Sequence, residues 1–395
     1  MTLRDTARAR PTRQELGRAL RASGALGQEW APAFEAVDRA AFLPDVMWPY
    51  DMATGASTTV DRRADPDAWY AHADRDVPIT TQWDDGAHEG PAPGRVATSS
   101  SSMPSIVFRM LDDLAPADGM RVLEIGTGTG WTAGLMAYRL GGRGVTSVEV
   151  DAAVADRART ALRSLDLAPQ VLTADGLLGH PAATPYDRTI ATCGMRRIPY
   201  AWIEQTAPGG LVVAPWGTAY ANRDTVVVLT VAPDGRSASG RFRRAVEFMK
   251  ARSQRTTRPP HAAYLPDGFP GDATATTTTL TADDGFADRF GAFAFAAGLR
   301  VPRCAWAADE RDGDHSVWWY GLDGDRSWAA VLFRGGAKEA TVHQSGPRGL
   351  WDEVAAAWQW WDAAGRPAPD RFGLTVTREG AWAWLDAAEG ERWRV

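Results

Sequence analysis

The 395-residue sequence contains only two cysteines, Cys193 and Cys304, which lie far apart along the chain. A disulfide framework and a zinc site built from cysteines are therefore excluded. The six histidines never occur at an H-x-x-x-H spacing, so we predict no metal site. No apolar run reaches the roughly 18 to 20 residues that span a bilayer. The charged stretch MTLRDTARAR does not resemble a secretory signal, so we expect a cytoplasmic protein.

The sequence also has no excess of basic residues. Lysine and arginine number 43 and aspartate and glutamate 49, which gives a net charge of 43 − 49 = −6. A dedicated nucleic-acid binder usually carries a basic excess, so we expect no nucleic acid as a partner. We also expect no membrane partner, because no apolar run is long enough to span a bilayer, and we assume by default that the protein is a monomer. Hydrophobic residues make up 45% and charged residues 23%, which is typical of a folded, soluble protein and excludes a disordered tail or a fibre.

The length predicts two or three domains rather than one. The first, residues 1–95, begins with a helical segment over 12–42, and Pro44 follows because proline cannot continue a helix. Residues 51–95 are polar and contain several prolines and glycines, so we interpret them as a long loop or insertion over the body of the protein. Loops of this length without structure of their own often cover a functional site.

Residues 96–250 alternate strand-like and helix-like segments, which predicts a second domain of the α/β class with a parallel sheet. The expected strands are RVLEIG (121–126), GVTSVEV (144–150), QVLTAD (170–175), YDRTIAT (186–192) and GLVVAPWG (210–217). The segment TVVVLTVA (225–232) is expected to be a final, antiparallel strand. Helices are expected over 131–140, 151–167 and 198–207.

The composition changes after Lys250, and residues 251–395 are expected to form an added α+β domain. Eleven of the 18 tryptophans lie there. A linker is expected over 251–268, strands over 316–322, 327–333 and 340–344, a helix over 347–364, and two closing strands at FGLTVT and AWAWLDA. We interpret this domain as one with a heavy aromatic core, with a peptide-docking surface as the alternative.

Two features of the C-terminal half leave alternatives open. The apolar face of helix 347–364 is interpreted as core, whereas Trp360 points the opposite way. Trp360 is either covered by another element or an exposed aromatic that contacts a peptide. Seven basic residues between 241 and 258 are interpreted as a solvated face, with an acidic peptide as the alternative partner.

The strongest functional signal is VLEIGTGTGW, residues 122–131. A strand leads into a glycine-rich turn, residues 126–130, and then into a helix. Glycines suit this turn because the chain bends sharply and a ligand can pack against the main chain without a Cβ in the way. Nicotinamide and flavin folds use a similar turn, so the motif alone leaves the cofactor open.

Three acids narrow the choice of cofactor. Glu124 lies two residues before the first glycine, the next strand ends in Glu149, whose carboxylate can accept two ribose hydroxyls, and the third ends in Asp175, placed to contact a purine. Together they indicate the S-adenosylmethionine (SAM) site of a class I methyltransferase with a Rossmann-like sheet, and a different cofactor on the same scaffold is the alternative. The expected SAM-binding residues are Glu124, Gly126, Thr127, Gly128, Gly130, Glu149, Asp175 and Gly176.

Motifs on both sides of the glycine turn resemble the protein-L-isoaspartate O-methyltransferase family. Upstream is TSSSSMPSIVFRML (98–111), where the family has T-I-S-x-P; downstream are a D-G-x-x-G turn, a P-Y-D strand and an I-P…Q…P-G-G-x-L-V-x-P-x-G ending. The matching residues are Asp175, Gly176, Gly179, Pro185, Tyr186, Asp187, Ile198, Pro199, Gln205, Pro208, Gly209, Gly210, Pro215 and Gly217. The resemblance covers roughly residues 12–250 and implies a SAM-dependent carboxyl O-methyltransferase.

In this family the serine of T-I-S lies by the substrate carboxylate. The resemblance therefore implies this catalytic role for Ser100, with Thr98, Ser99 and Ser101 beside it. The nucleophile is a carboxylate that is already ionised at neutral pH, since an unperturbed aspartate has a pKa of about 4. No strong general base is needed, and catalysis consists mainly of aligning one carboxylate oxygen behind the sulfonium methyl. Without the neighbouring motifs, the serine run would be interpreted as a flexible polar turn.

Three departures from the family pattern bear on the substrate. Ser101 and Ser102 stand where the family has a proline, the segment between Ile79 and Thr98 is longer, and residues 251–395 have no expected counterpart in the repair enzymes. This layout resembles the methyltransferases of ribosomal peptide pathways that make lanthipeptides, lasso peptides and graspetides. The resemblance implies that the substrate is an aspartate side chain in a constrained precursor peptide, whose methyl ester closes to an aspartimide that persists or hydrolyses to isoaspartate. The alternatives are general isoaspartyl repair and a non-catalytic scaffold that only binds a peptide.

Overall fold

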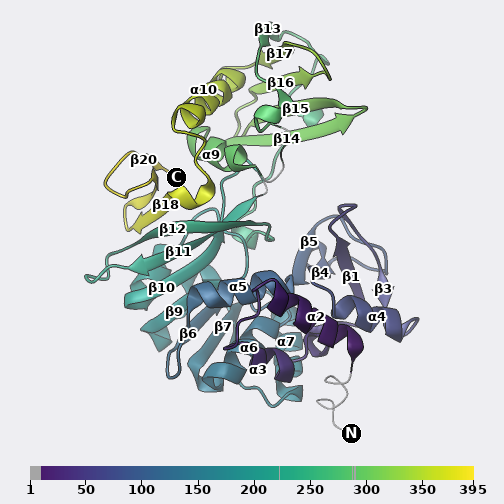
Figure 1. Cartoon of the computed structure of the whole chain (residues 1–395), viewed down its shortest axis with the longest axis vertical. Coiled ribbons are helices and arrows are strands. Elements are labelled where there is room, and N and C mark those ends of the chain that lie inside the picture. The colour runs from purple at the N-terminus through teal and green to yellow at the C-terminus, as the bar shows by residue number, and fades with distance from the viewer. Residues whose placement is uncertain (1–9, 222, 287, 289–290) are drawn as a thin grey trace. The chain divides into compact units, whose positions relative to one another are not determined.

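The computed structural model describes residues 10–221, 223–286, 288 and 291–395 (Figure 1). These residues fall into two units. The first unit holds the chain up to residue 193 together with 199–214 and 230–238, and the second holds 194–198, 215–229 and 239–395. Most of the N-terminal stretch in which we expect no secretory signal lies outside the described residues. Among the helices of the described part, none is both long and apolar enough to cross a membrane.

A parallel sheet forms the centre of the first unit, with the strand order β10-β9-β6-β7-β8. Its strands are β6 (Val122–Ile125), β7 (Val145–Glu149), β8 (Gln170–Thr173), β9 (Tyr186–Ala191) and β10 (Thr206–Trp216). The helices of this region are α5 (Pro104–Leu114), α6 (Trp131–Leu140), α7 (Ala152–Ser164) and α8 (Tyr200–Gln205). All residues of β6 and β7 are buried, as expected for central strands of a parallel sheet. The predicted α/β fold with a parallel sheet is confirmed.

The N-terminal segment is helical, as predicted. It contains α2 (Pro11–Ala22), α3 (Ala31–Ala36) and a short 3-10 turn, Arg39–Phe42. Leu16 and Leu20 of α2 and Phe34 of α3 are buried, and the Phe34 ring lies edge-on to Phe108 of α5, with 6.0 Å between the ring centroids.

Residues 51–95 contain short strands and a helix, so the interpretation as a long loop without structure of its own is wrong. The alternative, an insertion over the body of the protein, stays a prediction. Residues 56–57, 60–61 and 79–83 of this segment are strands of a small antiparallel sheet of order β2-β1-β4-β5, in which β3 also pairs with β1 (Figure 1). The elements are β1 (Val46–Asp51), β2 (Ala56–Ser57), β3 (Val60–Asp61), α4 (Pro66–Ala73), β4 (Ile79–Trp83) and β5 (Ala97–Ser101). The fully buried Trp69 of α4 packs in a cluster with Met47 and Ile79 of the sheet. The strands within residues 51–95 are only two to five residues long, which is too short for a clear apolar alternation in the sequence.

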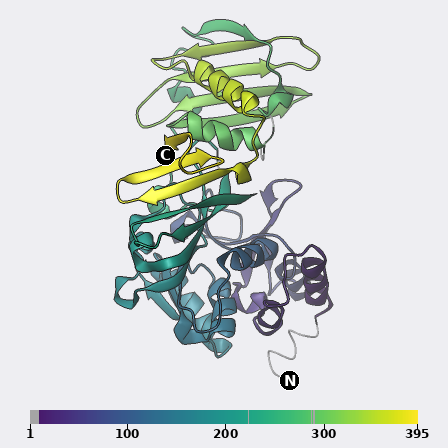
Figure 2. The same ribbon diagram turned by 60° about the vertical axis from the view of Figure 1, so that its left-hand side comes forward.

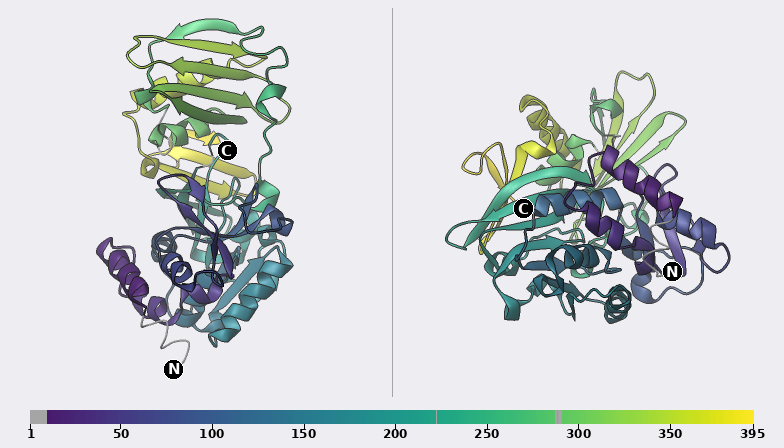
Figure 3. Two further views of the ribbon diagram at one scale, coloured as in Figure 1. Left: turned by 90° about the vertical axis from the view of Figure 1, so that its right-hand side faces the viewer. Right: turned by 60° about the horizontal axis from the view of Figure 1, so that its bottom comes forward.

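The second unit contains an antiparallel sheet of order β13-β17-β16-β15-β14. Its strands are β13 (Thr274–Thr278), β14 (Cys304–Arg311), β15 (Asp314–Gly321), β16 (Trp328–Phe333) and β17 (Ala340–Ser345). Figure 2 shows α10 (Leu350–Ala363) across one face of this sheet, and the left view of Figure 3 turns the strands toward the viewer. Helix α9 (Ala292–Arg300) packs against α10.

A second group of strands in this unit has the order β20-β19-β18-β12-β11. They are β11 (Asp224–Val231), β12 (Ser237–Val246), β18 (Phe372–Thr377), β19 (Gly380–Leu385) and β20 (Arg392–Arg394). Because β12 lies next to β11, the expectation that β11 is the final strand of its sheet is wrong. The strands and the helix predicted after residue 310 are all present, whereas α9, β14 and β20 are not among the predicted elements, and the threonine-rich stretch forms β13.

Trp360 is covered by another element rather than exposed. Its ring lies edge-on to Trp393 of β20, with 5.1 Å between the ring centroids, and the Arg300 guanidinium lies 4.7 Å from the Trp360 ring centroid. On the buried side of α10, the rings of Trp351 and Trp319 pack 5.4 Å apart.

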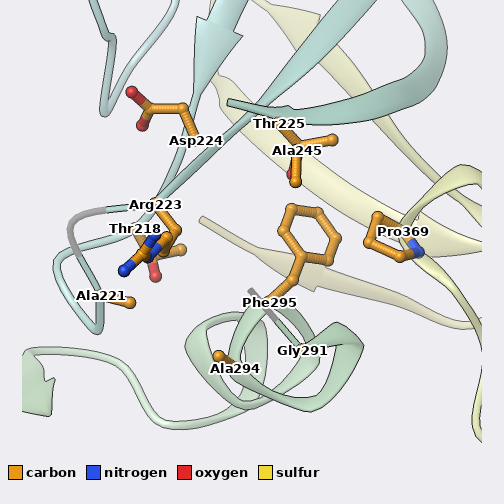
Figure 4. A pocket seen from close by; sticks show the side chains of 10 residues that line it. All are labelled: Thr218, Ala221, Arg223, Asp224, Thr225, Ala245, Gly291, Ala294, Phe295 and Pro369. Carbon is orange, nitrogen blue, oxygen red and sulfur yellow. The ribbon is translucent and has the colours of Figure 1, made fainter. Parts of the chain in front are cut away.

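A small pocket of about 30 Å³ lies within the second unit (Figure 4), which is room for about one water molecule. Phe295 projects into it, whereas the Asp224 carboxylate points away from Phe295. That carboxylate is fully buried and pairs with Lys250, whose Nζ lies 2.8 Å from Asp224 Oδ2. The pocket is therefore too small for a cofactor, and the charge on its wall is already paired.

We predict that Lys250→Ala destabilises the protein by about 3 to 5 kcal/mol, because it leaves the Asp224 charge buried without a partner. Urea unfolding measures this loss. Arg311→Ala serves as the control, since Arg311 and Asp309 form an exposed pair 3.1 Å apart that is worth less than about 1 kcal/mol. An equal effect of the two substitutions would contradict the prediction.

Candidate cofactor and active site

The candidate site begins where the parallel strands of the first unit end. Ile125 of β6 is in register with Val148 of β7 and with Ala191 of β9. The pairing continues past the strand ends, because the Gly126 N–H donates to the Val148 carbonyl over 2.8 Å and the Thr192 N–H donates to the Ile125 carbonyl over 2.9 Å. The loops after β6, β7 and β9 therefore start at one edge of the sheet, which is where open α/β sheets bind ligands.

The glycine turn after β6 requires glycine at the positions where the chain turns. Gly128 has φ +54° and Gly130 has φ +93°, which is the left-handed region that other residues rarely adopt. A Cβ on Gly130 would lie 3.0 Å from the Ala158 Cβ of α7, so the turn also packs closely on that helix.

Glu149, at the end of β7, lies directly against this turn. Its Oε2 accepts a hydrogen bond from the Gly128 N–H over 2.9 Å, and its Oε1 accepts one from the Asp151 N–H over 3.1 Å. The side chain is 8% exposed. The structure thus brings together three of the predicted cofactor residues, Gly126, Gly128 and Glu149, with one carboxylate fixed in orientation at the sheet edge.

Glu124 lies beneath the turn instead of facing an open site. It is fully buried, its Oε2 accepts a hydrogen bond from Ser147 Oγ over 2.5 Å, and Ser147 Oγ lies 2.6 Å from Thr127 Oγ1. Its Oε1 has no hydrogen-bond partner among the described residues. Burial raises the pKa of Glu124 to about 8, partly offset by the Ser147 hydrogen bond, so the carboxyl is mainly protonated at neutral pH.

Asp175 and Gly176 follow β8 at the same edge. Asp175 is exposed, and its Oδ1 accepts a hydrogen bond from the Leu177 N–H over 2.9 Å, which fixes the 3-10 turn Gly176–Leu178. The Gly176 carbonyl accepts a hydrogen bond from Trp202 Nε1 of α8 over 2.8 Å. Asp175 thereby shapes this turn while its side chain remains accessible.

Two exposed apolar residues at this edge are not among the predicted site residues. Val150, directly after Glu149, is 52% exposed, and Leu178, in the turn after β8, is 65% exposed. Apolar side chains in these places suit the flat face of a purine. Val150 directly follows Glu149, and Leu178 lies three residues after Asp175; these positions next to the acids are the sequence signal that could have identified them.

The serine segment forms strand β5 and lies beside the glycine turn. The Ser100 carbonyl oxygen is 3.4 Å from the position that a Cβ on Gly128 would take. Side chains alternate along the strand: Ser99 and Ser101 are buried at 8% and 2% exposed, whereas Thr98 and Ser100 are half-buried. The structure therefore places Ser100 next to the predicted cofactor residues and separates the four candidate hydroxyls into two faces.

Ser101 is engaged by an arginine that the sequence analysis does not identify. Arg39 is 3% exposed, and its Nε donates to Ser101 Oγ over 2.9 Å. Burial lowers the pKa of Arg39 to about 9, with the Asp76 and Asp74 carboxylates opposing the fall, so the guanidinium is charged at neutral pH. No local motif marks this contact, because Arg39 precedes Ser101 by 62 residues.

Ser102 is a further hydroxyl that the sequence analysis leaves out of the site. Pro104 is the first residue of α5, so Ser102, Met103 and Pro104 have the S-x-P spacing of the family motif. Ser102 is half-buried between β5 and α5. The S-x-P spacing of residues 102–104 is therefore the sequence signal for Ser102, whereas the T-x-S spacing of Thr98 and Ser100 favours Ser100.

Thr98 connects the small antiparallel sheet to the end of β7. Its Oγ1 donates to Gln82 Oε1 over 3.0 Å, and Gln82 Nε2 donates to Asp151 Oδ2 over 3.0 Å. Asp151 is the N-cap of α7 and also donates its N–H to Glu149. Thr98 therefore orients the loop next to Glu149 through Gln82.

We predict that the stability of the wild-type protein falls as pH rises from about 4.5 to 8, relative to Glu124→Gln. The folded state keeps the Glu124 proton up to a pKa of about 8, whereas the unfolded chain releases it near the ordinary value of 4.5. Urea unfolding at several pH values measures the difference between the two proteins. Parallel stability curves across this range would contradict a neutral Glu124.

The comparisons with known proteins agree with this geometry. Residues 11–254 match the family model "Protein-L-isoaspartate(D-aspartate) O-methyltransferase (PCMT)". The protein-L-isoaspartate O-methyltransferase of Methylibium petroleiphilum is 36% identical over 157 residues, which is 38% of this chain and 57% of the relative. That of Anaeromyxobacter dehalogenans is 44% identical over 120 residues, which is 30% of this chain and 56% of the relative. The chain thus spans about half the length of the curated relatives it matches.

The likeness in fold extends beyond the family model. A solved structure named protein-L-isoaspartate O-methyltransferase has a TM-score of 0.53 with this chain at 20% identity, and covers 95% of this chain and 100% of its own. That coverage includes most of residues 251–395, so the expectation that these residues have no counterpart among such enzymes is wrong. With residues 11–254 matched by its model, the chain belongs to the protein-L-isoaspartate O-methyltransferase family and has the class I SAM-dependent methyltransferase fold.

Proposed function

We propose that this protein is a SAM-dependent methyltransferase that esterifies the free carboxylate of isoaspartyl residues in peptides and proteins. The observation that carries the proposal is that Gly128 of the glycine turn contacts both Glu149, through its N–H, and Ser100, whose carbonyl oxygen lies 3.4 Å from the position of a Cβ on Gly128. A cofactor-type loop and a hydroxyl-bearing strand meet at one sheet edge, inside the region that matches the family. The names of the curated relatives, all protein-L-isoaspartate O-methyltransferases, support the choice of substrate.

The residues at the sheet edge fit SAM. Glu149 can accept the two ribose hydroxyls with a carboxylate that is already oriented by main-chain donors. Gly126 and Gly128 leave main chain open for the amino-acid end, and Val150 with Leu178 can contact the purine. Glu124 and Thr127 support the turn from beneath.

When bound, SAM supplies a methyl group on a positively charged sulfur. The substrate carboxylate is ionised at neutral pH, so the protein needs no general base. That methyl group would be transferred to a carboxylate oxygen, and the electron pair of the broken carbon–sulfur bond would remain on sulfur. The serine segment holds the carboxylate through hydroxyl and main-chain donors. Because the carboxylate is already aligned when it is bound, the entropic part of the activation barrier is lower than for two molecules that meet freely in solution.

A narrower substrate is a second candidate. The segment before β5 is ordered, because Asp84 Oδ1 accepts a hydrogen bond from the Val96 N–H over 2.8 Å and Asp84 Oδ2 accepts one from Arg95 N–H over 3.0 Å. The Asp85 N–H also donates to Thr98 Oγ1 over 3.1 Å. A rigid segment next to the substrate strand would suit an ordinary aspartate in a constrained precursor peptide, whose ester closes to an aspartimide with loss of methanol. The family relatives favour the general isoaspartyl substrate over this one.

Mass spectrometry after incubation with SAM tests the proposal on three peptides: a short linear isoaspartyl peptide, the same peptide with normal aspartate, and a cyclised peptide with a normal Asp-Gly. We predict a gain of one methyl group on the isoaspartyl peptide alone. Methylation of the cyclised peptide alone, followed by loss of methanol, would contradict general repair and support the precursor substrate.

Binding of S-adenosylhomocysteine, measured by titration calorimetry, separates the enzyme from a peptide-binding scaffold. Glu149→Gln should weaken binding by tenfold or more, because hydrogen bonds to a charged group are worth about 1.5 to 3 kcal/mol. Asp156→Asn on the surface of α7 should leave binding unchanged, since Asp156 pairs only with Arg159 in the described contacts. Tight binding without methylation of any peptide would favour the scaffold.

The serine segment offers a test of which hydroxyl holds the carboxylate. We predict that Ser102→Ala and Ser100→Ala each lower kcat/KM for the isoaspartyl peptide by tenfold or more, because each removes a donor next to the reacting carboxylate. Ser99→Ala, on the buried face of the strand, should change kcat/KM by less than about threefold. Steady-state kinetics give the three values. A loss confined to Ser99→Ala would show that the segment presents its other face to the substrate.

A further inference from the structure

Arg39 forms an unusual buried contact with the serine segment. Its guanidinium has no ion pair among the described residues and instead donates six hydrogen bonds, five of them to main-chain carbonyls. Nη2 donates to the carbonyls of Ser101 (2.8 Å), Ser102 (3.0 Å) and Val77 (2.9 Å), Nη1 donates to those of Arg75 (3.1 Å) and Ala73 (3.3 Å), and Nε donates to Ser101 Oγ (2.9 Å).

These acceptors come from two separate stretches of chain. One is the turn between α4 and β4, and the other is the end of β5 immediately before α5. Arg39 Cζ also lies 5.7 Å from the ring centroid of Trp131, the first residue of α6 after the glycine turn. The Trp131 Nε1–H donates to the Val37 carbonyl over 3.2 Å, two residues before Arg39. Arg39 is therefore in contact with both the serine segment and the helix that follows the cofactor turn.

We propose that Arg39 is the positioning residue of the active site, which holds residues 100–102 at a fixed distance from the glycine turn. The proposal rests on the proposed function. A planar guanidinium can satisfy five carbonyls in several directions at once, whereas the three donors of a lysine ammonium cannot. Without it, the carbonyls of Ser101 and Ser102 would lose the guanidinium as a donor, and we expect the segment to shift. Arg39 does not itself touch the substrate, so its effect on the reaction acts through the serine hydroxyls.

Arg13 provides a matched control for burial and charge. It is 6% exposed, its Nη1 donates to the Glu35 carbonyl over 3.3 Å, and its Nε lies 3.6 Å from Asp38 Oδ1. Like Arg39, it joins separate parts of the N-terminal region. None of its described contacts involves the serine segment, so its loss should reduce stability without moving that segment.

The test compares Arg39→Gln, Arg39→Lys and Arg13→Gln in the full chain by hydrogen–deuterium exchange and by steady-state kinetics. In Arg39→Gln, we expect exchange of the amides in residues 98–104 to rise about tenfold or more. We also expect kcat for the isoaspartyl peptide to fall about tenfold to a hundredfold, since small displacements of reacting groups have effects of that size. The affinity for S-adenosylhomocysteine should stay within about threefold. Arg39→Lys should be intermediate, and Arg13→Gln should leave both exchange at 98–104 and kcat unchanged.

The proposal would be overturned if residues 98–104 of Arg39→Gln were as protected as in the wild type, or if its loss of kcat were no larger than that of Arg13→Gln. Should Arg39→Gln not fold, the same two readouts on Arg39→Lys decide the question. Hydrogen exchange requires no turnover. Loss of protection in a chain whose wild type methylates no peptide would therefore refute the proposed function while supporting the role of Arg39 in holding the segment.

Discussion

The parallel pairing of β6 with β7 on one side and β9 on the other is the constraint on which the rest of the site depends. Hydrogen bonds continue this pairing beyond the strand ends, so the loops that begin at Gly126 and Thr192 start at the same edge of the sheet. The glycine turn after β6, the Glu149 carboxylate at the end of β7 and the loop that starts at Thr192 therefore lie at one edge of the sheet. Glu149 completes the arrangement, because its carboxylate accepts the N–H of Gly128 in the neighbouring loop.

The second constraint is the burial of a positive charge next to the serine segment. Removing a guanidinium from water is unfavourable unless its donors are satisfied, and Arg39 satisfies them with carbonyls rather than with a carboxylate. Those carbonyls come from the chain between α4 and β4 and from the end of β5, and Gln82 of β4 also reaches Asp151 beside Glu149. The N-terminal segment thus contacts the serine segment directly through Arg39.

The parts of the site that could be predicted from sequence are those whose conformation depends on residues close to them in the chain. The turn over residues 126–130 needs glycine because of its own backbone angles, and Glu149 follows directly from the end of its strand. Arg39 could not be identified in this way, because its acceptors lie 34 to 63 residues further along the chain and five of the six are main-chain atoms that any residue carries. The strands in residues 51–95 escaped prediction for a related reason: they are short and polar, and the fully buried Trp69 supports them from α4. The fold of the C-terminal residues could not be compared with other proteins from motifs alone, whereas a solved structure with a TM-score of 0.53 covers 95% of the chain.

A crystal structure of the chain with S-adenosylhomocysteine and an isoaspartyl peptide tests the central claim most directly. The account predicts that the ribose hydroxyls donate to Glu149, that the purine contacts Val150 and Leu178, and that the peptide carboxylate lies within hydrogen-bond distance of Ser100 or Ser102. A nucleoside bound away from Glu149, or a peptide carboxylate remote from residues 100–102, would contradict the account.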